Sequence, residues 1–186
     1  MTDGIHFKRF VARAGKVIHR ARVFSIRPVH VRAPNGRRFE HHIVFHPGAA
    51  VVVPVLPGER FVLVRQYRAA AQRALLEFPA GTLESKESPL ECAKREIIEE
   101  TGYRARRWKR LGSFYPAPGV STEFMHLFLA TGLSPAQGVP DLDEFLEREI
   151  ISFPRLQKLI FQGTIVDGKT LLGFFYYCRF RPRGVR

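Results

Sequence analysis

Three glutamates within one helical turn carry the strongest chemical signal in this sequence. Glu96, Glu99 and Glu100 follow the spacing i, i+3 and i+4, so on a helix their carboxylates converge on one face. Arg95 precedes Glu99 by four residues and can hold that carboxylate in place. Carboxylates so close together repel each other unless a cation neutralises them, and Mg²⁺ prefers such oxygen ligands. A solvated acidic helix face is the alternative interpretation.

The segment from Ser88 to Gly102 is predicted to be the helix that positions these carboxylates. It begins with Ser-Pro-Leu-Glu, which combines an N-cap serine, a proline at the first helical position and a capping box. Glycine is typical of the position that follows a helix. The apolar residues that recur at helical spacing are expected to face the core: Leu90, Ala93 and Ile97.

The rest of the chain predicts an α+β domain. From Lys16 to about Val64, β-branched and aromatic residues alternate with turn signals such as Ala33–Gly36, a pattern typical of strands. Three more strands are expected at 111–115, 125–130 and 146–151, and two more helices at 153–162 and 169–179, the second behind an Asp167 N-cap. Strands followed by helices that alternate with strands imply a layered domain.

The residues around the acidic helix complete a longer motif. The motif is Gly-x5-Glu-x7-Arg-Glu-U-x-Glu-Glu-x-Gly-U, where U is bulky and apolar. Every fixed position is met, by Gly81, by Glu87 and by the run Arg95–Tyr103. This run resembles the Nudix box, so the chain resembles the Nudix hydrolase superfamily. The runs Arg65–Arg68 and Leu76–Gly81 before the helix resemble those of ADP-ribose pyrophosphatases within it.

The resemblance implies both a fold and an activity. The fold is a Nudix-type α/β/α sandwich with a mixed sheet, preceded by an N-terminal antiparallel strand region. Residues 1–46 would be that region and a dimerisation element, residues 47–180 the hydrolase domain and residues 181–186 a basic tail. The activity is Mg²⁺-dependent hydrolysis of ADP-ribose to AMP and ribose 5-phosphate by a homodimer.

The same resemblance assigns the metal ligands and the general base. The metal ligands would be the carboxylates of Glu96, Glu99 and Glu100 and the carbonyl of Ala80, with Mn²⁺ as the alternative metal. Glu96 and Glu99 thereby belong to the catalytic set. The general base of the family lies in an acidic loop, which aligns with residues 139–144 and makes Glu144 the first choice. Asp141 and Asp143 are the substitutes, because Leu142 stands where the family often has a glutamate.

Four residues are assigned to the substrate by the resemblance. Arg68 would meet the diphosphate, and the alternative for this residue is an ion pair with Glu77. Gly81 would let the loop approach both metal and phosphate, because glycine has no Cβ. Glu123 would contact the terminal ribose, and Pro118 stands where the subfamily carries a proline near its substrate.

Composition limits the remaining classes of protein. The chain has 186 residues and a formal net charge of +13, yet residues 81–104 hold six acidic against four basic residues. A basic body around an acidic segment suits an anionic ligand that approaches bound cations. The sequence holds no apolar run near the ~20 residues that a membrane-spanning helix needs, and no secretory leader, so a membrane partner is excluded and a cytoplasmic location is expected.

The two cysteines cannot form a disulfide framework or a four-cysteine zinc site. Cys92 lies among the acidic residues of the predicted helix and is interpreted as a packing residue. Trp108 lies between basic residues, and it is expected to pack onto the core rather than serve as a stacking platform.

Three other functions remain as alternatives. The first keeps the chemistry and changes the substrate to another nucleoside diphosphate sugar, such as GDP-mannose or UDP-glucose. The second is hydrolysis of RNA 5′ ends, suggested by the positive charge. The third is a non-catalytic nucleic-acid-binding module, and nucleic acid is the less favoured ligand because three converging carboxylates would have no purpose there.

Overall fold

The computed structural model describes residues 9–137 and 146–181. The chain divides into two compact units, each described here by itself. The first unit comprises Met1–Pro47 and Ala117–Phe124, and the second comprises Gly48–Pro116 and Met125–Arg186.

The first unit is built on a four-stranded antiparallel sheet. Its strands are β1 (Val11–Ala14), β2 (His19–Arg20), β3 (Ser25–Arg32) and β4 (Arg38–Phe45), and β3 pairs with each of the other three. The predicted turn between β3 and β4 is confirmed, with Gly36 at a φ of 84°, a conformation that glycine adopts without strain. The segment Ala117–Phe124 attaches to β4 through Val44, whose N–H donates to the Val120 carbonyl at 2.9 Å.

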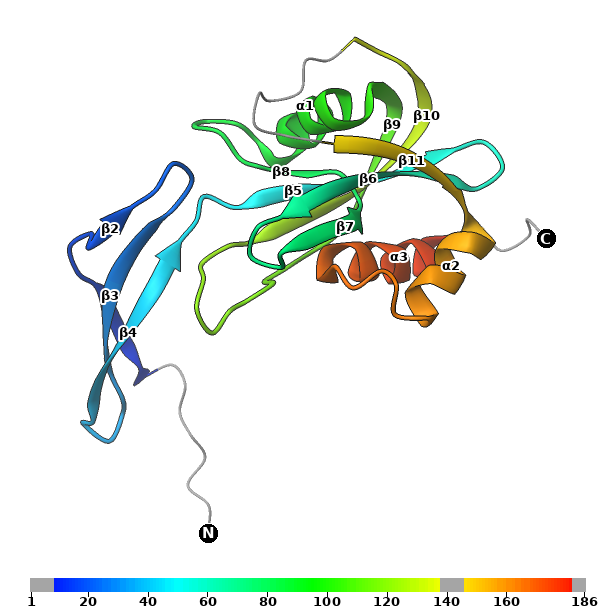
Figure 1. The fold of residues 1–186 in the computed structure, drawn as a ribbon. Helices are drawn as coiled ribbons and strands as arrows, with labels where there is room; N and C mark the ends of the chain where they lie inside the picture. The colour runs from blue at the N-terminus through cyan, green and yellow to red at the C-terminus, as the bar shows by residue number, and fades with distance from the viewer. Residues whose placement is uncertain (1–8, 138–145, 182–186) are drawn as a thin grey trace. The chain divides into compact units, whose positions relative to one another are not determined.

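The second unit contains a seven-stranded mixed sheet of order β11-β6-β5-β10-β9, with β7 paired to β6 and β8 to β5 (Figure 1). Within it, β5 and β10 run parallel and the other described pairs run antiparallel. The strands are β5 (Ala49–Leu56), β6 (Arg60–Arg68), β7 (Arg73–Glu77), β8 (Ala80–Thr82), β9 (Tyr103–Phe114), β10 (Met125–Pro135) and β11 (Leu146–Ser152). A mixed sheet with helices is the α+β class that the sequence predicts.

Helices cover both faces of this sheet, with α1 (Pro89–Thr101) on one and α2 (Phe153–Phe161) and α3 (Gly168–Phe180) on the other (Figure 1). Successive residues of a strand point to opposite faces, and β5 shows this directly. Ala50 and Val52 pack with residues of α1, whereas Val51 and Val53 pack with residues of α2 and α3. The expected sandwich is therefore confirmed, and its central strand is buried along almost its whole length.

The acidic helix has the ends that the sequence predicts. The Ser88 hydroxyl accepts from the Glu91 N–H at 3.3 Å, and the Glu91 carboxylate accepts from the Ser88 N–H at 2.8 Å, which completes the capping box. Gly102 ends the helix in the left-handed conformation, with a φ of 66°. Ala93 and Ile97 are fully buried, while Leu90 is partly buried against the same cluster.

The prediction of strands needs correction in two places. The strand expected at 111–115 is β9, which begins at Tyr103, directly after the helix. Its first half is rich in arginine and lysine, and it can carry these charges because, among the described strands, β9 pairs with β10 alone. Trp108 packs edge-on against Phe128, as expected. The short strands β7 and β8 were not predicted, because their apolar residues are interrupted by Glu77, Pro79 and Gly81.

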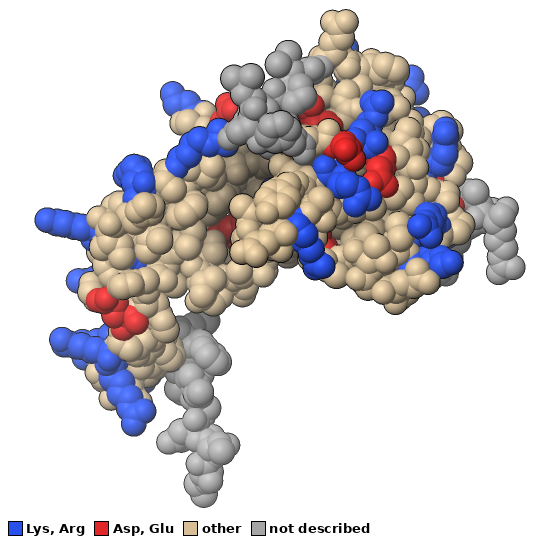
Figure 2. All heavy atoms as spheres, viewed as in Figure 1, with Lys and Arg blue, Asp and Glu red and all other residues tan. Residues whose placement is uncertain are grey.

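The surface agrees with the composition. Figure 2 shows many lysine and arginine side chains on the visible face and only a few carboxylates, which lie in small groups. None of the helices formed by residues 9–137 and 146–181 is long and apolar enough to cross a membrane.

Candidate active site

Strand β8 and the acidic face of α1 meet at Gly81. A Cβ atom on this residue would lie 1.7 Å from Oε1 of Glu96, far inside van der Waals contact. Only glycine therefore allows the backbone to approach the Glu96 carboxylate so closely. Next to it, the Ala80 N–H donates to Oε2 of Glu100 at 3.1 Å. Glu96 and Glu100 are both buried, each with 7% of its surface exposed.

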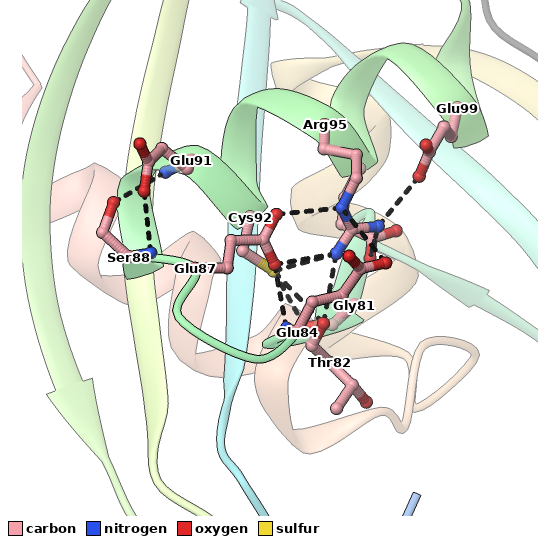
Figure 3. A network of polar contacts seen from close by, with 10 residues as sticks. Gly81, Thr82, Glu84, Glu87, Ser88, Glu91, Cys92, Arg95 and Glu99 are labelled. Carbon is pink, nitrogen blue, oxygen red and sulfur yellow. Dashed lines mark hydrogen bonds and ion pairs between the residues drawn. The ribbon is translucent and has the colours of Figure 1, made fainter. Parts of the chain in front are cut away.

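Arg95 lies at the centre of a polar network (Figure 3). Its Nε and Nη2 donate to the Glu87 carboxylate at 2.9 and 3.1 Å. Its Nη1 donates to Glu96 at 2.6 Å and to Glu99 at 2.9 Å, and Nη2 also donates to the Thr82 carbonyl. The expected pair of Arg95 with Glu99 is confirmed. The contact of Arg95 with Glu87 was not predicted, although both residues are fixed positions of the motif.

These contacts favour the ionised forms of Glu87 and Arg95. Hydrogen bonds from Arg95 lower the pKa of Glu87, and the three carboxylates around Arg95 raise its own pKa. Cys92 lies beside them on α1 and is fully buried, as expected of a packing residue. Burial, followed by the negative charges of Glu96 and Glu87, raises the pKa of its thiol to about 12.

The donor chemistry of this region fits a hard divalent cation. It offers three carboxylates on one helical turn, and the Gly81 backbone lies against one of them. In residues 9–137 and 146–181, no three histidine, cysteine, aspartate or glutamate side chains stand together as a preformed metal cluster. This agrees with the contacts of Arg95, which occupies the space between the carboxylates of Glu96 and Glu99. A cation would have to share these carboxylates with the guanidinium.

A second polar network lies at the end of β6. Nε and Nη2 of Arg68 donate to the Glu77 carboxylate, with a shortest distance of 2.6 Å. Lys169, at the start of α3, donates to the same carboxylate and to Asp167. Burial by itself would lower the pKa of Arg68, but the hydrogen bond and the charge of Glu77, together with the charges of Glu100 and Asp167, outweigh burial and raise the pKa. The ion pair with Glu77, which was the alternative interpretation of Arg68, is thus present.

The structure groups some of the predicted site residues and not others. It brings together five of them on β8 and α1: Ala80, Gly81, Glu96, Glu99 and Glu100. Pro118 and Glu123 belong to the first unit, where Pro118 is exposed and Glu123 lies 3.9 Å from the His46 ring. Glu144, the residue chosen as general base, and its substitutes Asp141 and Asp143 lie outside the described residues.

The second unit is thus a layered α/β/α domain in which an acidic helix packs against a glycine of β8. Residues 45–171 match the NUDIX domain family, which is most of the chain. The chain therefore belongs to the Nudix family. A solved structure described as an ADP compounds hydrolase shares the fold, with a TM-score of 0.79 over 91% of this chain and 93% of that one, at 22% identity.

Similar sequences come from several bacteria. An ADP-ribose pyrophosphatase of Bacillus subtilis is 35% identical over 168 residues, which cover 87% of this chain and 91% of the relative. A methanol dehydrogenase activator of Bacillus methanolicus is 35% identical over 161 residues, covering 86% and 87%. A GDP-mannose pyrophosphatase of Yersinia enterocolitica is 33% identical over 134 residues, covering 67% and 70%.

Proposed function

We propose that this chain hydrolyses the diphosphate linkage of ADP-ribose and releases AMP and ribose 5-phosphate. One observation carries the proposal: the Glu96 carboxylate lies where a side chain on residue 81 would have to be. In the fold, the first glycine of the Nudix motif, in β8, and the acidic helix α1 therefore meet. Family membership and the relative named ADP-ribose pyrophosphatase support the same substrate.

In this proposal Mg²⁺ is held by Glu96, Glu99, Glu100 and the Ala80 carbonyl. When bound, the cation stabilises the charge that develops on the diphosphate oxygens and makes a bound water more acidic. Arg95 orients the carboxylates through the contacts described above. Gly81 brings the backbone close to the substrate.

The other substrate contacts come from outside this helix. Arg68 binds the diphosphate through its guanidinium, which can hold two phosphate oxygens at once. Glu123 is proposed for the terminal ribose and Pro118 for the wall of its site, and Glu144 is proposed as the general base. If replacing Glu144 with glutamine left kcat unchanged, the base would have to be another residue.

A homodimer and a cytoplasmic location are part of the proposal. The first unit exposes several large apolar side chains, among them Val11, Ile18 and Phe39, at 51%, 57% and 41% of their surfaces, and a second copy would cover them. Cys92 and Cys178 are both free, which fits a reducing compartment. Light scattering of the purified protein should give twice the mass of one chain.

The test is a comparison of substrates in the presence of Mg²⁺, with chromatography of the products. The panel contains ADP-ribose, GDP-mannose, UDP-glucose, diadenosine polyphosphates and 5′-triphosphate RNA. ADP-ribose should be hydrolysed fastest and give AMP and ribose 5-phosphate, and EDTA should abolish the reaction. The variant that combines Glu96→Gln with Glu100→Gln serves as the blank. A wild-type rate no higher than this blank on every substrate would overturn the catalytic proposal.

GDP-mannose is the second candidate substrate, because the Yersinia relative carries the name GDP-mannose pyrophosphatase. Faster turnover of GDP-mannose would keep the chemistry and change the nucleotide. The similarity to the methanol dehydrogenase activator suggests a further assay, in which the chain is added to a methanol dehydrogenase and the dehydrogenase rate is followed.

A further inference from the structure

The Glu77 carboxylate at the end of β7 is the centre of a buried network that the Nudix motif does not include. Glu77 exposes only 1% of its surface. Arg68 binds it from β6, and Lys169 binds it from the first turn of α3, 92 residues away in the chain. Lys169 is itself buried, with 9% exposed, and also pairs with Asp167 at 3.0 Å.

The charges of this network balance. Two cations, Arg68 and Lys169, face two carboxylates, Glu77 and Asp167. A buried charge is costly unless it is paired, so each of these side chains depends on the others. Arg68 alone could neutralise Glu77. Lys169 neutralises Asp167, and its ammonium also donates to Glu77, so it links the pair of Glu77 and Arg68 to the first turn of α3.

The geometry of Arg68 indicates a role for this link. Its Nε and one N–H of Nη2 face Glu77, so this edge of the guanidinium is occupied. Nη1 has no hydrogen-bond acceptor among residues 9–137 and 146–181, and 38% of the side chain is exposed. The outer edge, formed by Nη1 and the second N–H of Nη2, can still bind two phosphate oxygens side by side. The ion pair with Glu77 and the contact with a diphosphate are therefore compatible.

The first turn of α3 also holds the backbone beside Glu77. The Thr170 hydroxyl accepts from the Phe78 N–H at 2.8 Å and donates to Asp167 at 2.6 Å. Asp167 in turn caps α3 by accepting from the Thr170 N–H at 3.0 Å. The same turn of α3 thus fixes both the carboxylate of Glu77 and the chain that continues from it to Ala80 and Gly81.

We propose that Lys169 is a positioning residue, which acts through Glu77 to hold the guanidinium of Arg68 in the orientation that binds the substrate diphosphate. This inference rests on the proposed function. Lys169 donates to Oε2 of Glu77, the oxygen that also accepts from Nη2 of Arg68, so a rotation of the carboxylate away from the guanidinium would break the contact with Lys169 as well. Without Lys169, Glu77 is held by Arg68 alone, and the direction of the guanidinium is no longer tied to α3.

The test separates positioning from simple stabilisation by measuring kcat, KM and the melting temperature of a set of variants. Lys169→Met should raise KM for ADP-ribose by about tenfold with a much smaller change in kcat, because Arg68 binds the diphosphate before and during the reaction. Lys169→Arg, which keeps the charge, should recover part of the loss. Lys158→Met, at an exposed lysine of α2, is the matched control and should leave KM unchanged.

A double variant gives the decisive comparison. Arg68→Gln should raise KM by itself, and adding Lys169→Met should raise it little further, because no guanidinium remains to be oriented. If Lys169→Met does not fold, combining it with Glu77→Gln removes both charges, and this pair should show the same rise in KM.

Three results would overturn the proposal. A lower melting temperature with KM within twofold of wild type would mean that Lys169 is only structural. If the rise in KM of the double variant were the product of the rises caused by Lys169→Met and by Arg68→Gln, the two residues would act separately. If the wild type hydrolyses none of the diphosphate substrates, the proposed function itself fails and this inference fails with it. The first two results leave the proposed function intact.

Discussion

At the level of single residues, the distance between Gly81 and Glu96 limits what the site tolerates. Gly81→Ala would place a methyl group on the Glu96 carboxylate, which would have to move away. Because a displacement of about 1 Å can cost about 10²-fold in rate, kcat for ADP-ribose should fall by about that factor. Gly168→Ala is the control, since a Cβ there meets nothing within 4 Å. Equal kcat in both variants would contradict the close contact.

Cys92 gives a second prediction for a single residue. Its pKa of about 12 leaves almost no thiolate at pH 8, and its side chain is buried, so it should not react with iodoacetamide in the folded protein. Cys178 is exposed and should react first. Mass spectrometry of the peptides should find Cys92 modified only after denaturation. Rapid modification of Cys92 in the native protein would show that α1 and β8 separate around this side chain.

The residues of the site were predicted to different extents. The convergence of Glu96, Glu99 and Glu100 follows from helical spacing alone, and so does the contact of Arg95 with Glu99. The contact of Arg95 with Glu87 and that of Lys169 with Glu77 cross between elements. Such contacts depend on how strands and helices pack, which residue spacing does not describe.

At the level of elements, the capping box of α1 should contribute measurably to stability. Ser88→Ala removes the acceptor for the Glu91 N–H and should lower the free energy of unfolding by about 1 kcal/mol. Ser152→Ala is a matched control, because Ser152 is the N-cap of α2 but makes no capping hydrogen bond through its side chain. Urea denaturation of both variants checks the difference. A loss as large for Ser152→Ala would argue against the cap as the cause.

The helices were easier to predict than the strands, for a physical reason. A helix signals its ends through local hydrogen bonds, as Ser88, Asp167 and Gly102 do. A strand is stabilised by partners distant in the chain. The charged half of β9 therefore does not look like a strand until β10 pairs with it.

For the molecule as a whole, acid should reduce stability, because the carboxylates of Glu87 and Glu59 have lowered pKa values in the folded protein. Arg95 lowers the pKa of Glu87 below its ordinary value of 4.5. At Glu59, burial favours the protonated form, but the hydrogen bonds from Arg181 and Tyr177 outweigh it and also leave a lowered pKa. As pH falls below 4.5, these two glutamates become protonated in the unfolded chain while they are still ionised in the folded chain. The free energy of unfolding therefore falls.

Urea denaturation between pH 7 and pH 3 measures this effect. Glu87→Gln should be less stable than wild type at pH 7 and should lose less stability on acidification, because it has no carboxylate to protonate at that position. Glu59→Gln should behave in the same way. Parallel pH curves for wild type and both variants would show that other groups cause the acid sensitivity.

The route of the chain through its two units has a consequence for how this protein can be rearranged. Between β9 and β10 the chain leaves the second unit, adds the segment Ala117–Phe124 to the first, and returns. The carbonyl of Val44 accepts from the Thr122 N–H, and the His46 N–H donates to the Thr122 hydroxyl. Removal of Met1–Pro47 would strip these partners from Thr122. The first unit is therefore not a detachable module, and a recombination event with one crossover cannot exchange it whole between related proteins.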